Sequence, residues 1–179
     1  MSSANRGPHH HAFRIHTPYS PFGKIVAHSA AMALRGGGRR MSAVDIRVAV
    51  IVDPSLPVGL IANTVAAVGI GIGAAATELG GVLLTDSNGR TALTSANRPV
   101  PILQASPEVM ASLLLRALPA PEGGIVVPFP RFARAIHNFE DYLAEFPRRS
   151  LEGEAMEGLG IAGPEKWVRS LTGSLKLLR

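Results

Sequence analysis

The sequence predicts an α/β fold: a three-layer sandwich in which a mixed, mostly parallel sheet of about four strands lies between helices. Residues 46–52 form a run of β-branched residues, which is typical of a strand buried on both faces. A long uncharged helix follows, and segments of strand composition then alternate with segments of helical periodicity. This alternation favours a sheet covered by helices, with right-handed crossovers wherever neighbouring strands are parallel.

The distribution of charge divides the chain at residue 40. Six of its 18 Lys and Arg residues lie in residues 1–40, where there is no Asp or Glu. Residues 41–179 carry 12 basic and 13 acidic residues and are close to neutral. We therefore expect a single α/β domain over residues 41–179, preceded by a basic extension without stable structure. A nearly neutral domain argues against a nucleic-acid partner, because nucleic-acid binding concentrates basic charge on the folded surface.

Three interpretations of residues 1–40 stay open. An Arg-rich segment without acidic residues is similar in composition to an organellar transit peptide. Such a segment would also serve as a tail that binds anions without specificity. The third interpretation is that translation begins at Met41, directly before the first strand. No metal site is assigned to His9, His10 and His11, because adjacent histidines in a tail are usually adventitious ligands.

The helix after the first strand carries no charge. The strand ends at Asp53, a turn with two prolines follows, and a helix is predicted from about Val58. No charged residue lies between Asp53 and Glu78, a span long enough to suggest a transmembrane segment. We reject membrane insertion, because the segment is rich in Ala and Gly, contains Asn63 and Thr64, and follows a strand. We expect this helix to be covered on all sides, by its own sheet and by another helix or subunit.

Three alternate glycines near the end of this helix, Gly69, Gly71 and Gly73, resemble a dinucleotide-binding fingerprint. That fingerprint must lie between a strand and a helix, because it places the pyrophosphate at the helix N-terminus. These glycines fall in the last turns of a helix, where they allow a neighbouring backbone to approach closely. No cofactor is therefore predicted.

The rest of the chain predicts a small hairpin and further strands and helices. The hairpin covers residues 82–94 with Asn88-Gly89 at its tip, although the same segment is compatible with a loop. Ser106 provides an N-cap, and Gly173 is placed to end the last helix in a left-handed cap. Strands are predicted at residues 99–103, 125–129 and 156–162, and helices at residues 107–118, 131–146 and 165–172.

The chain contains no cysteine, which excludes disulfides, thiolate nucleophiles and thiolate-bound metals. A reducing compartment is therefore permitted. The N-terminus shows no apolar core of a secretory signal. We expect a cytoplasmic protein that does not associate with membranes and holds no metal.

Two motifs near the ends of the domain carry a family resemblance. Leu-Thr-Gly-Ser-Leu-Lys-Leu-Leu at residues 171–178, after Gly-Ile-Ala-Gly-Pro at residues 160–164, resembles the C-terminal signature of type 2 peptidyl-tRNA hydrolases. Val-Asp-Pro-Ser-Leu-Pro-Val-Gly-Leu-Ile-Ala-Asn at residues 52–63, with the same ending, is more similar to a bacterial family, domain of unknown function two-thousand. The resemblance covers about residues 45–179. It implies a fold similar to that of the hydrolases and no established activity.

Two departures from the hydrolases bear on mechanism. In the hydrolases a lysine after the turn glycine begins the active-site helix, and Leu60 stands at that position here. An Asp-x-Gly-x-Thr segment precedes their last strand, whereas residues 150–157 have no such pattern. The comparison therefore implies a fold of this type without the ester-cleaving residues.

The candidate site lies at the carboxyl end of the first strand, where α/β folds commonly bind ligands. Asp53 would act there as a general base or accept a hydrogen bond from a ligand, and Asn63 would both donate and accept. The structural alternative is that Asp53 caps the turn and Asn63 satisfies a backbone group. The ligand-binding candidates are Asp53, Gly59, Asn63, Thr64, Thr172 and Ser174.

Two functions are compatible with these residues. The first is a noncatalytic or small-ligand-binding relative of the hydrolases that acts as a homodimer. The second is a hydrolase whose non-standard site is built on Asp53, Asn63 and Thr172. The two differ in what the cleft contains, a retained small molecule or a catalytic carboxylate with a raised pKa.

Overall fold

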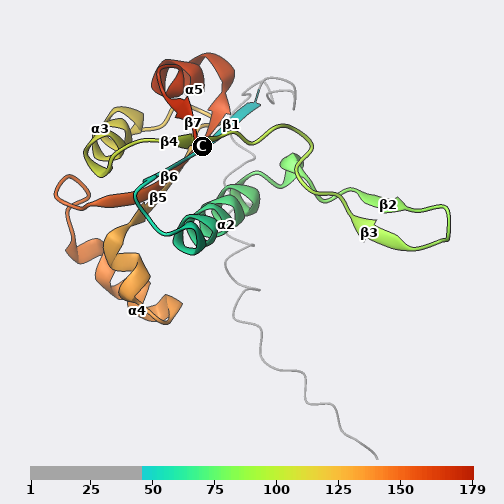
Figure 1. Ribbon diagram of the computed structural model, residues 1–179, viewed down its shortest axis with the longest axis horizontal. Helices are drawn as coiled ribbons and strands as arrows, with labels where there is room; N and C mark the ends of the chain where they lie inside the picture. Colours follow the sequence, from blue (N-terminus) through green and yellow to red (C-terminus); the bar gives the residue numbers. More distant parts are fainter. Residues whose placement is uncertain (1–45) are drawn as a thin grey trace, which may run out of the picture. The chain divides into compact units, whose positions relative to one another are not determined.

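The computed structural model describes residues 46–179 (Figure 1). The basic extension of residues 1–40, its three interpretations and its histidines lie outside the described residues. Three 3₁₀ helices, Thr77–Leu79, Arg131–Ala135 and Phe146–Arg148, join the main elements. The main elements are, in order, β1 (Ile46–Val52), α2 (Val58–Ala75), β2 (Leu83–Thr85), β3 (Thr91–Leu93), β4 (Ile102–Gln104), α3 (Pro107–Ala117), β5 (Ile125–Pro130), α4 (Phe139–Glu145), β6 (Met156–Pro164), α5 (Glu165–Thr172) and β7 (Lys176–Leu177).

Five strands form one mixed sheet in the order β5-β6-β1-β4-β7, and β2 and β3 form a separate hairpin. Only β1 and β4 are parallel neighbours, and the other three pairs are antiparallel. The mixed sheet between helices agrees with the prediction, but the expected count of four strands and the mostly parallel order are wrong. Residues 131–155, which include α4, leave the sheet after Pro130 and return to it at Met156. Because Pro130 and Met156 pair with each other, β6 runs antiparallel beside β5. The two-residue β7 is too short for periodicity to detect.

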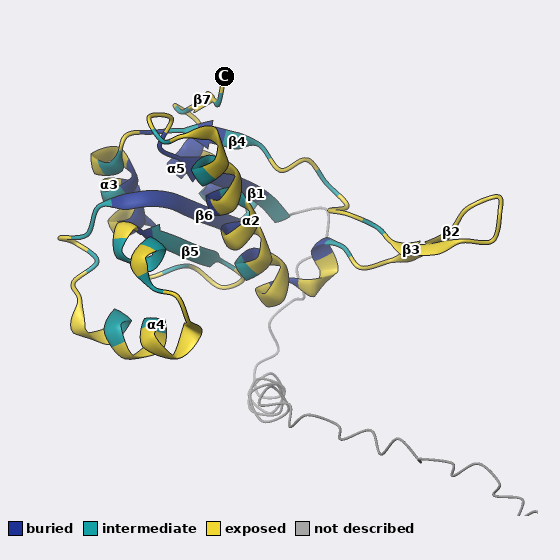
Figure 2. Cartoon of the chain, turned by 60° about the horizontal axis from the view of Figure 1, so that its bottom comes forward, coloured by how far each residue is buried: buried dark blue, intermediate teal, exposed yellow. Residues whose placement is uncertain are grey.

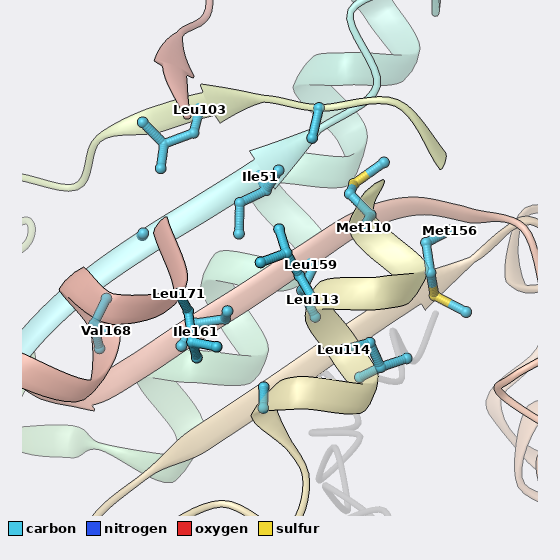
Figure 3. Close-up of a cluster of buried hydrophobic side chains, with 13 residues drawn as sticks. Ile51, Leu103, Met110, Leu113, Leu114, Met156, Leu159, Ile161, Val168 and Leu171 are labelled. Atoms are coloured by element: carbon cyan, nitrogen blue, oxygen red, sulfur yellow. The ribbon is translucent and has the colours of Figure 1, made fainter. Parts of the chain in front are cut away.

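β1 lies in the middle of the sheet and is buried on both faces, as its composition predicts. Ala49 and Ile51 pack on one face against α3 and α5, in the core drawn in Figure 3. Val48, Val50 and Val52 pack on the opposite face, under α2. The sheet is thus covered on both faces, which gives the predicted three layers.

Two glycines of β6 bring α2 close to the sheet. A Cβ atom added at Gly158 would overlap Cγ2 of Thr64, and one added at Gly160 would overlap Cγ1 of Val68. Any side chain at these positions would push the helix away and open the core between them. Close approach therefore requires glycine in β6, and in α2 a Cβ added at Gly71 would lie 3.0 Å from Cγ1 of Val127 in β5.

The outer face of α2 is exposed, in contrast to its inner face. Only Thr64, Val68 and Ile72 of this helix are buried, and Ile70 is 73% exposed. Cover by the sheet is confirmed, and within residues 46–179 no second layer lies over the outer face (Figure 2). Cover by a second subunit stays a prediction. Among the described residues, α2 is the one helix long and apolar enough to cross a bilayer, and it packs along one side on β5 and β6.

Several local predictions are confirmed and others are wrong. The hairpin forms, with Gly89 at a φ of 81°, and the Ser106 hydroxyl accepts a hydrogen bond from the Val109 amide to cap α3. The left-handed cap at Gly173 is wrong, because this residue has a φ of −64°. The left-handed residue of that region is Gly163, before α5.

The single helix predicted over residues 131–146 is also wrong. A 3₁₀ helix ends at Ala135, and Asn138 starts α4 by accepting a hydrogen bond from the Asp141 amide at 2.8 Å. An Asn side chain that competes for backbone amides favours a new helix start over a helix interior. The predicted apolar face is only partly formed: the rings of Phe132 and Tyr142 stack at 5.8 Å, but Phe139 and Leu143 are 63% and 57% exposed.

Candidate functional site

Asp53 lies directly after β1 and is only 5% exposed. Its Oδ1 atom accepts hydrogen bonds from the amide of Ser55 at 2.9 Å and from the Ser55 hydroxyl at 2.7 Å. Its own amide donates to the carbonyl of Glu157 at 3.4 Å. The carboxylate therefore closes the Asp-Pro-Ser turn, which is the contact that the structural alternative requires.

The pairing of β7 brings the C-terminal motif to the carboxyl end of β1, where Asp53 lies. Lys176 pairs with Gln104 of β4, and Gln104 pairs on its other side with Val52, the last residue of β1. Thr172 and Ser174 lie just before this strand, the first buried and the second exposed. The Thr172 hydroxyl donates to the carbonyl four residues earlier in α5, at 2.8 Å. The C-terminal candidates thus lie near the carboxyl end of β1, as predicted, but the Thr172 hydroxyl is directed towards its own helix.

The three candidates in α2 have different surroundings. Gly59 and Asn63 are exposed, whereas Thr64 is fully buried and faces β6. The Thr64 hydroxyl lies 3.0 Å from a terminal nitrogen of Arg134, which donates to it. His137, the one histidine of residues 41–179, is exposed as predicted but lies outside a helix.

A buried ion-pair cluster joins Thr64 to β6, and sequence reasoning did not identify it. The side chain of Glu157 is 6% exposed and pairs with Arg131 at 3.1 Å and Arg134 at 2.7 Å. The guanidinium of Arg134 also lies over the ring of Phe129, 5.3 Å from its centroid. Both carboxylate oxygens therefore have a charged donor, as a buried carboxylate requires.

A β-bulge directs Glu157 into this cluster. Phe129 pairs with Gly158 and Pro130 pairs with Met156, so Glu157 is the extra residue of β6. Successive strand residues normally alternate between faces, and an extra residue breaks that alternation. Met156 packs into the core on the α3 side while Glu157 turns to meet Arg134, which also donates to the Thr64 hydroxyl. The available sequence signals were a glutamate in an apolar strand and two arginines three residues apart.

A groove of about 460 Å³ lies between α2 and the segment that joins β3 to β4. Val48 and Val50 of β1 form its floor, α2 forms one wall, and the segment between β3 and β4 forms the other. Gly69 and Gly73 face open space on the helix wall, because no atom lies within 4 Å of where a Cβ would be. The glycines that resemble a nucleotide fingerprint therefore help to form an apolar groove.

Arg98 is the one charged residue among those that line the groove. Its Nε atom donates to the side chain of Asn97 at 2.9 Å, and one terminal nitrogen donates to the carbonyl of Ile46. Asn97 is itself fixed by donating to the carbonyls of Glu78 and Leu79, both at 2.8 Å. The guanidinium is thus held in a defined position by the backbone around it, which is how binding sites preorganise a charged group.

None of the residues predicted for the site lines this groove. Its walls come from three segments that share no motif, so spacing in the sequence could not reveal it. Within residues 46–179, no group of three or more His, Cys, Asp or Glu residues is arranged to hold a metal ion.

Comparisons with known proteins agree on the fold and assign no activity. The family described as protein of unknown function (DUF2000) matches residues 46–179. A solved structure of a protein of unknown function, Atu0240 from Agrobacterium tumefaciens strain C58, is similar with a TM-score of 0.68 and 21% sequence identity. The similarity covers 74% of this chain and 97% of that protein. No curated protein matches the chain.

Proposed function

The chain belongs to the DUF2000 family, whose function is unknown, and we propose that it is a noncatalytic protein that binds a small ligand in the groove beside α2. The observation that carries this proposal is the combination of size and lining. Small-molecule sites typically occupy about 300–1,000 Å³ and are mostly apolar with a few fixed polar groups. The groove, at about 460 Å³, meets each of these criteria.

The lining indicates the chemistry of the ligand. Val48, Ile72 and Leu79 offer apolar surface, and Gly69 and Gly73 let a ligand approach the helix backbone. Arg98 supplies the charge, and a guanidinium favours carboxylate or phosphate partners. The expected ligand therefore has an apolar body and an anionic end.

The contacts of the predicted site residues support a noncatalytic role. A general base needs a carboxylate that can reach a substrate, and that of Asp53 accepts two hydrogen bonds from Ser55. The hydroxyl of Thr172 donates within its helix, which leaves Asn63 as the exposed member of the three. The alternative, a hydrolase built on Asp53, Asn63 and Thr172, would have to use Oδ2 of Asp53, because both bonds from Ser55 end on Oδ1, and requires the Thr172 hydroxyl to exchange its internal bond for one to a substrate.

A fold similar to that of type 2 peptidyl-tRNA hydrolases, a bacterial origin and a cytoplasmic location are part of the same proposal. The fold and the origin rest on the two end motifs, residues 52–63 and 171–178, and the location rests on the composition, which includes no cysteine. The absence of nucleic-acid and membrane partners rests on the neutral charge and on the packing of α2.

Decanoate and decanol, which share an apolar body and differ in charge, test the groove. Gly73→Leu fills the groove and should weaken decanoate binding at least tenfold, or about 1.4 kcal/mol. Gly59→Leu is the matched control, because Gly59 lies on the same helix in open space outside the groove. Arg98→Gln should weaken decanoate more than decanol. Native mass spectrometry of the purified protein would in addition identify a retained ligand.

Two results would contradict the proposal. If neither probe binds and native mass spectrometry finds no retained molecule, the groove is not a ligand site of this class. If Gly73→Leu and Gly59→Leu reduce binding equally, the probes bind elsewhere on the exposed helix.

A further inference from the structure

The β2–β3 hairpin with its base, residues 82–94, forms an arm whose apolar side chains are exposed on both faces. Val82, Leu83, Leu84 and Leu93 are 57%, 65%, 60% and 65% exposed. Leu83 pairs with Leu93, so both lie on one face, and Leu84 points to the opposite face because strand residues alternate. Single exposed leucines are ordinary, but a group of them on a small element indicates an interaction surface.

The arm projects away from the five-stranded sheet and the helices around it (Figures 1 and 2). Its strands are exposed along their whole length, three residues each. An isolated two-stranded hairpin is at best marginally stable in water and usually needs a packed face. The polar tip, where Asp86 and Arg90 form an ion pair at 2.8 Å, leaves the leucines as the surface to be covered.

The outer face of α2 is a second surface that lacks a cover within residues 46–179. Val58 and Ile70 are 83% and 73% exposed. The 18 residues of the helix include no charged side chain. A partner can therefore approach its backbone closely without desolvating a charge.

We propose that these two surfaces bind each other between two copies of the chain, the arm of each copy packing on the outer face of α2 of the other. The arm follows α2 in the chain after the short Thr77–Leu79 helix. A two-fold axis near that helix would place each arm on the helix of the other copy, and the interface would be the same on both subunits. The homodimer expected from the sequence thus acquires defined surfaces.

Charge and area favour a second copy over a one-sided partner. Both surfaces are uncharged and apolar, so they match each other. The outer face of α2 is about 27 Å by about 10 Å, and one face of the arm is about 20 Å by about 10 Å. Reciprocal docking would bury on the order of 900 Å² in total, which lies in the range of weak, transient interfaces below about 1,200 Å². A partner bound to the arm alone would bury far less.

The absence of cysteine makes disulfide cross-linking free of background. Chains carrying Ile70→Cys and chains carrying Leu84→Cys or Leu93→Cys, with different affinity tags, would be co-expressed and oxidised. We expect a mixed disulfide for whichever of Leu84 and Leu93 faces α2, formed at least fivefold faster than with Lys166→Cys. Lys166 is the matched control because it is exposed on α5, on the opposite face of the sheet.

Sedimentation of the full chain at about 50 µM should give a dimer, and Ile70→Lys should make it a monomer that keeps the circular dichroism spectrum of the folded chain. Asn88→Lys, which adds the same charge at the tip of the arm, should leave the dimer intact. A monomeric wild-type chain would overturn the proposal. It would be overturned equally if residues 1–45 or another protein covered the arm in that monomer. A dimer that cross-links equally well through Lys166→Cys would overturn it too.

Discussion

At the scale of single residues, the surroundings of a carboxylate decide its role more than its place in a motif. Asp53 follows the central strand, where ligand-binding residues are common, yet its carboxylate is bonded to Ser55. Glu157 lies in a strand of apolar residues, yet a bulge turns it towards two arginines. Both carboxylates are buried, and a buried charge is tolerated only with such partners. We infer that both carboxylates stabilise the end of the sheet at which β1 ends and β6 begins.

The two arginines of the cluster should differ in their effect on stability. Arg134→Met removes the partner that is 21% exposed and leaves one oxygen of the buried Glu157 carboxylate without a charged donor. The free energy of unfolding should therefore fall by about 3 kcal/mol. Arg131→Met removes a partner that is 63% exposed and should cost less than about 1 kcal/mol. Urea unfolding of the two variants measures the difference. Equal losses would show that the Arg134 pair is not the buried, dominant one.

At the scale of elements, the sequence predicts what local signals determine and misses what distant pairing determines. The β-branched run of β1, the Asn88-Gly89 turn and the Ser106 cap act within a few residues, and all are observed. The direction of β6 depends on where the segment of α4 returns to the sheet. The bulge at Glu157 depends on pairing with β5. Neither leaves a periodic pattern, which is why the mostly parallel order was wrong.

The close packing of α2 on β6 gives a prediction at this scale. Gly158→Ala places a methyl group where it overlaps Thr64 in the fully packed layer, so the variant should lose about 2 kcal/mol of stability. Gly153→Ala is the matched control, because the nearest atom to its added Cβ is 3.9 Å away. Thermal unfolding followed by circular dichroism compares them. A Gly158→Ala variant as stable as the control would mean that α2 can move without cost.

At the scale of the whole molecule, the candidate binding site could be predicted only in part. Strand ends and end motifs are visible in the sequence, so Asp53, Thr172 and Ser174 were predicted to lie at one end of the sheet, but none of them lines the groove. The groove was missed because its floor, helix wall and Arg98 meet only after β1 and β4 pair in the folded sheet. The uncharged helix was recognised as needing cover, and the arm that could provide it was predicted only as a hairpin.

The last prediction is that this protein does not hydrolyse peptidyl-tRNA at a useful rate. Cleavage of an ester beside a polyanion needs positive charge to hold the phosphates and to stabilise the developing oxyanion. On the motif resemblance of residues 52–63, Leu60 takes the position of the lysine of the hydrolases, and residues 41–179 have 12 basic against 13 acidic residues. The carboxylate of Asp53 and the hydroxyl of Thr172 are bonded within the fold. Loss of one preorganised group typically costs about 100- to 1,000-fold in rate, so several losses should leave little activity.

An assay of the purified chain against an N-acyl-aminoacyl-tRNA, beside an authentic type 2 hydrolase, measures this directly. We expect less than about 1% of the rate of the hydrolase. Leu60→Lys restores one charge and should fail as well, because no neighbouring group would orient the new ammonium. A rate within about tenfold of the hydrolase would refute the noncatalytic proposal, since the missing groups would then be dispensable. Asp53→Asn and Thr172→Val variants would in that case show whether the alternative site carries the reaction.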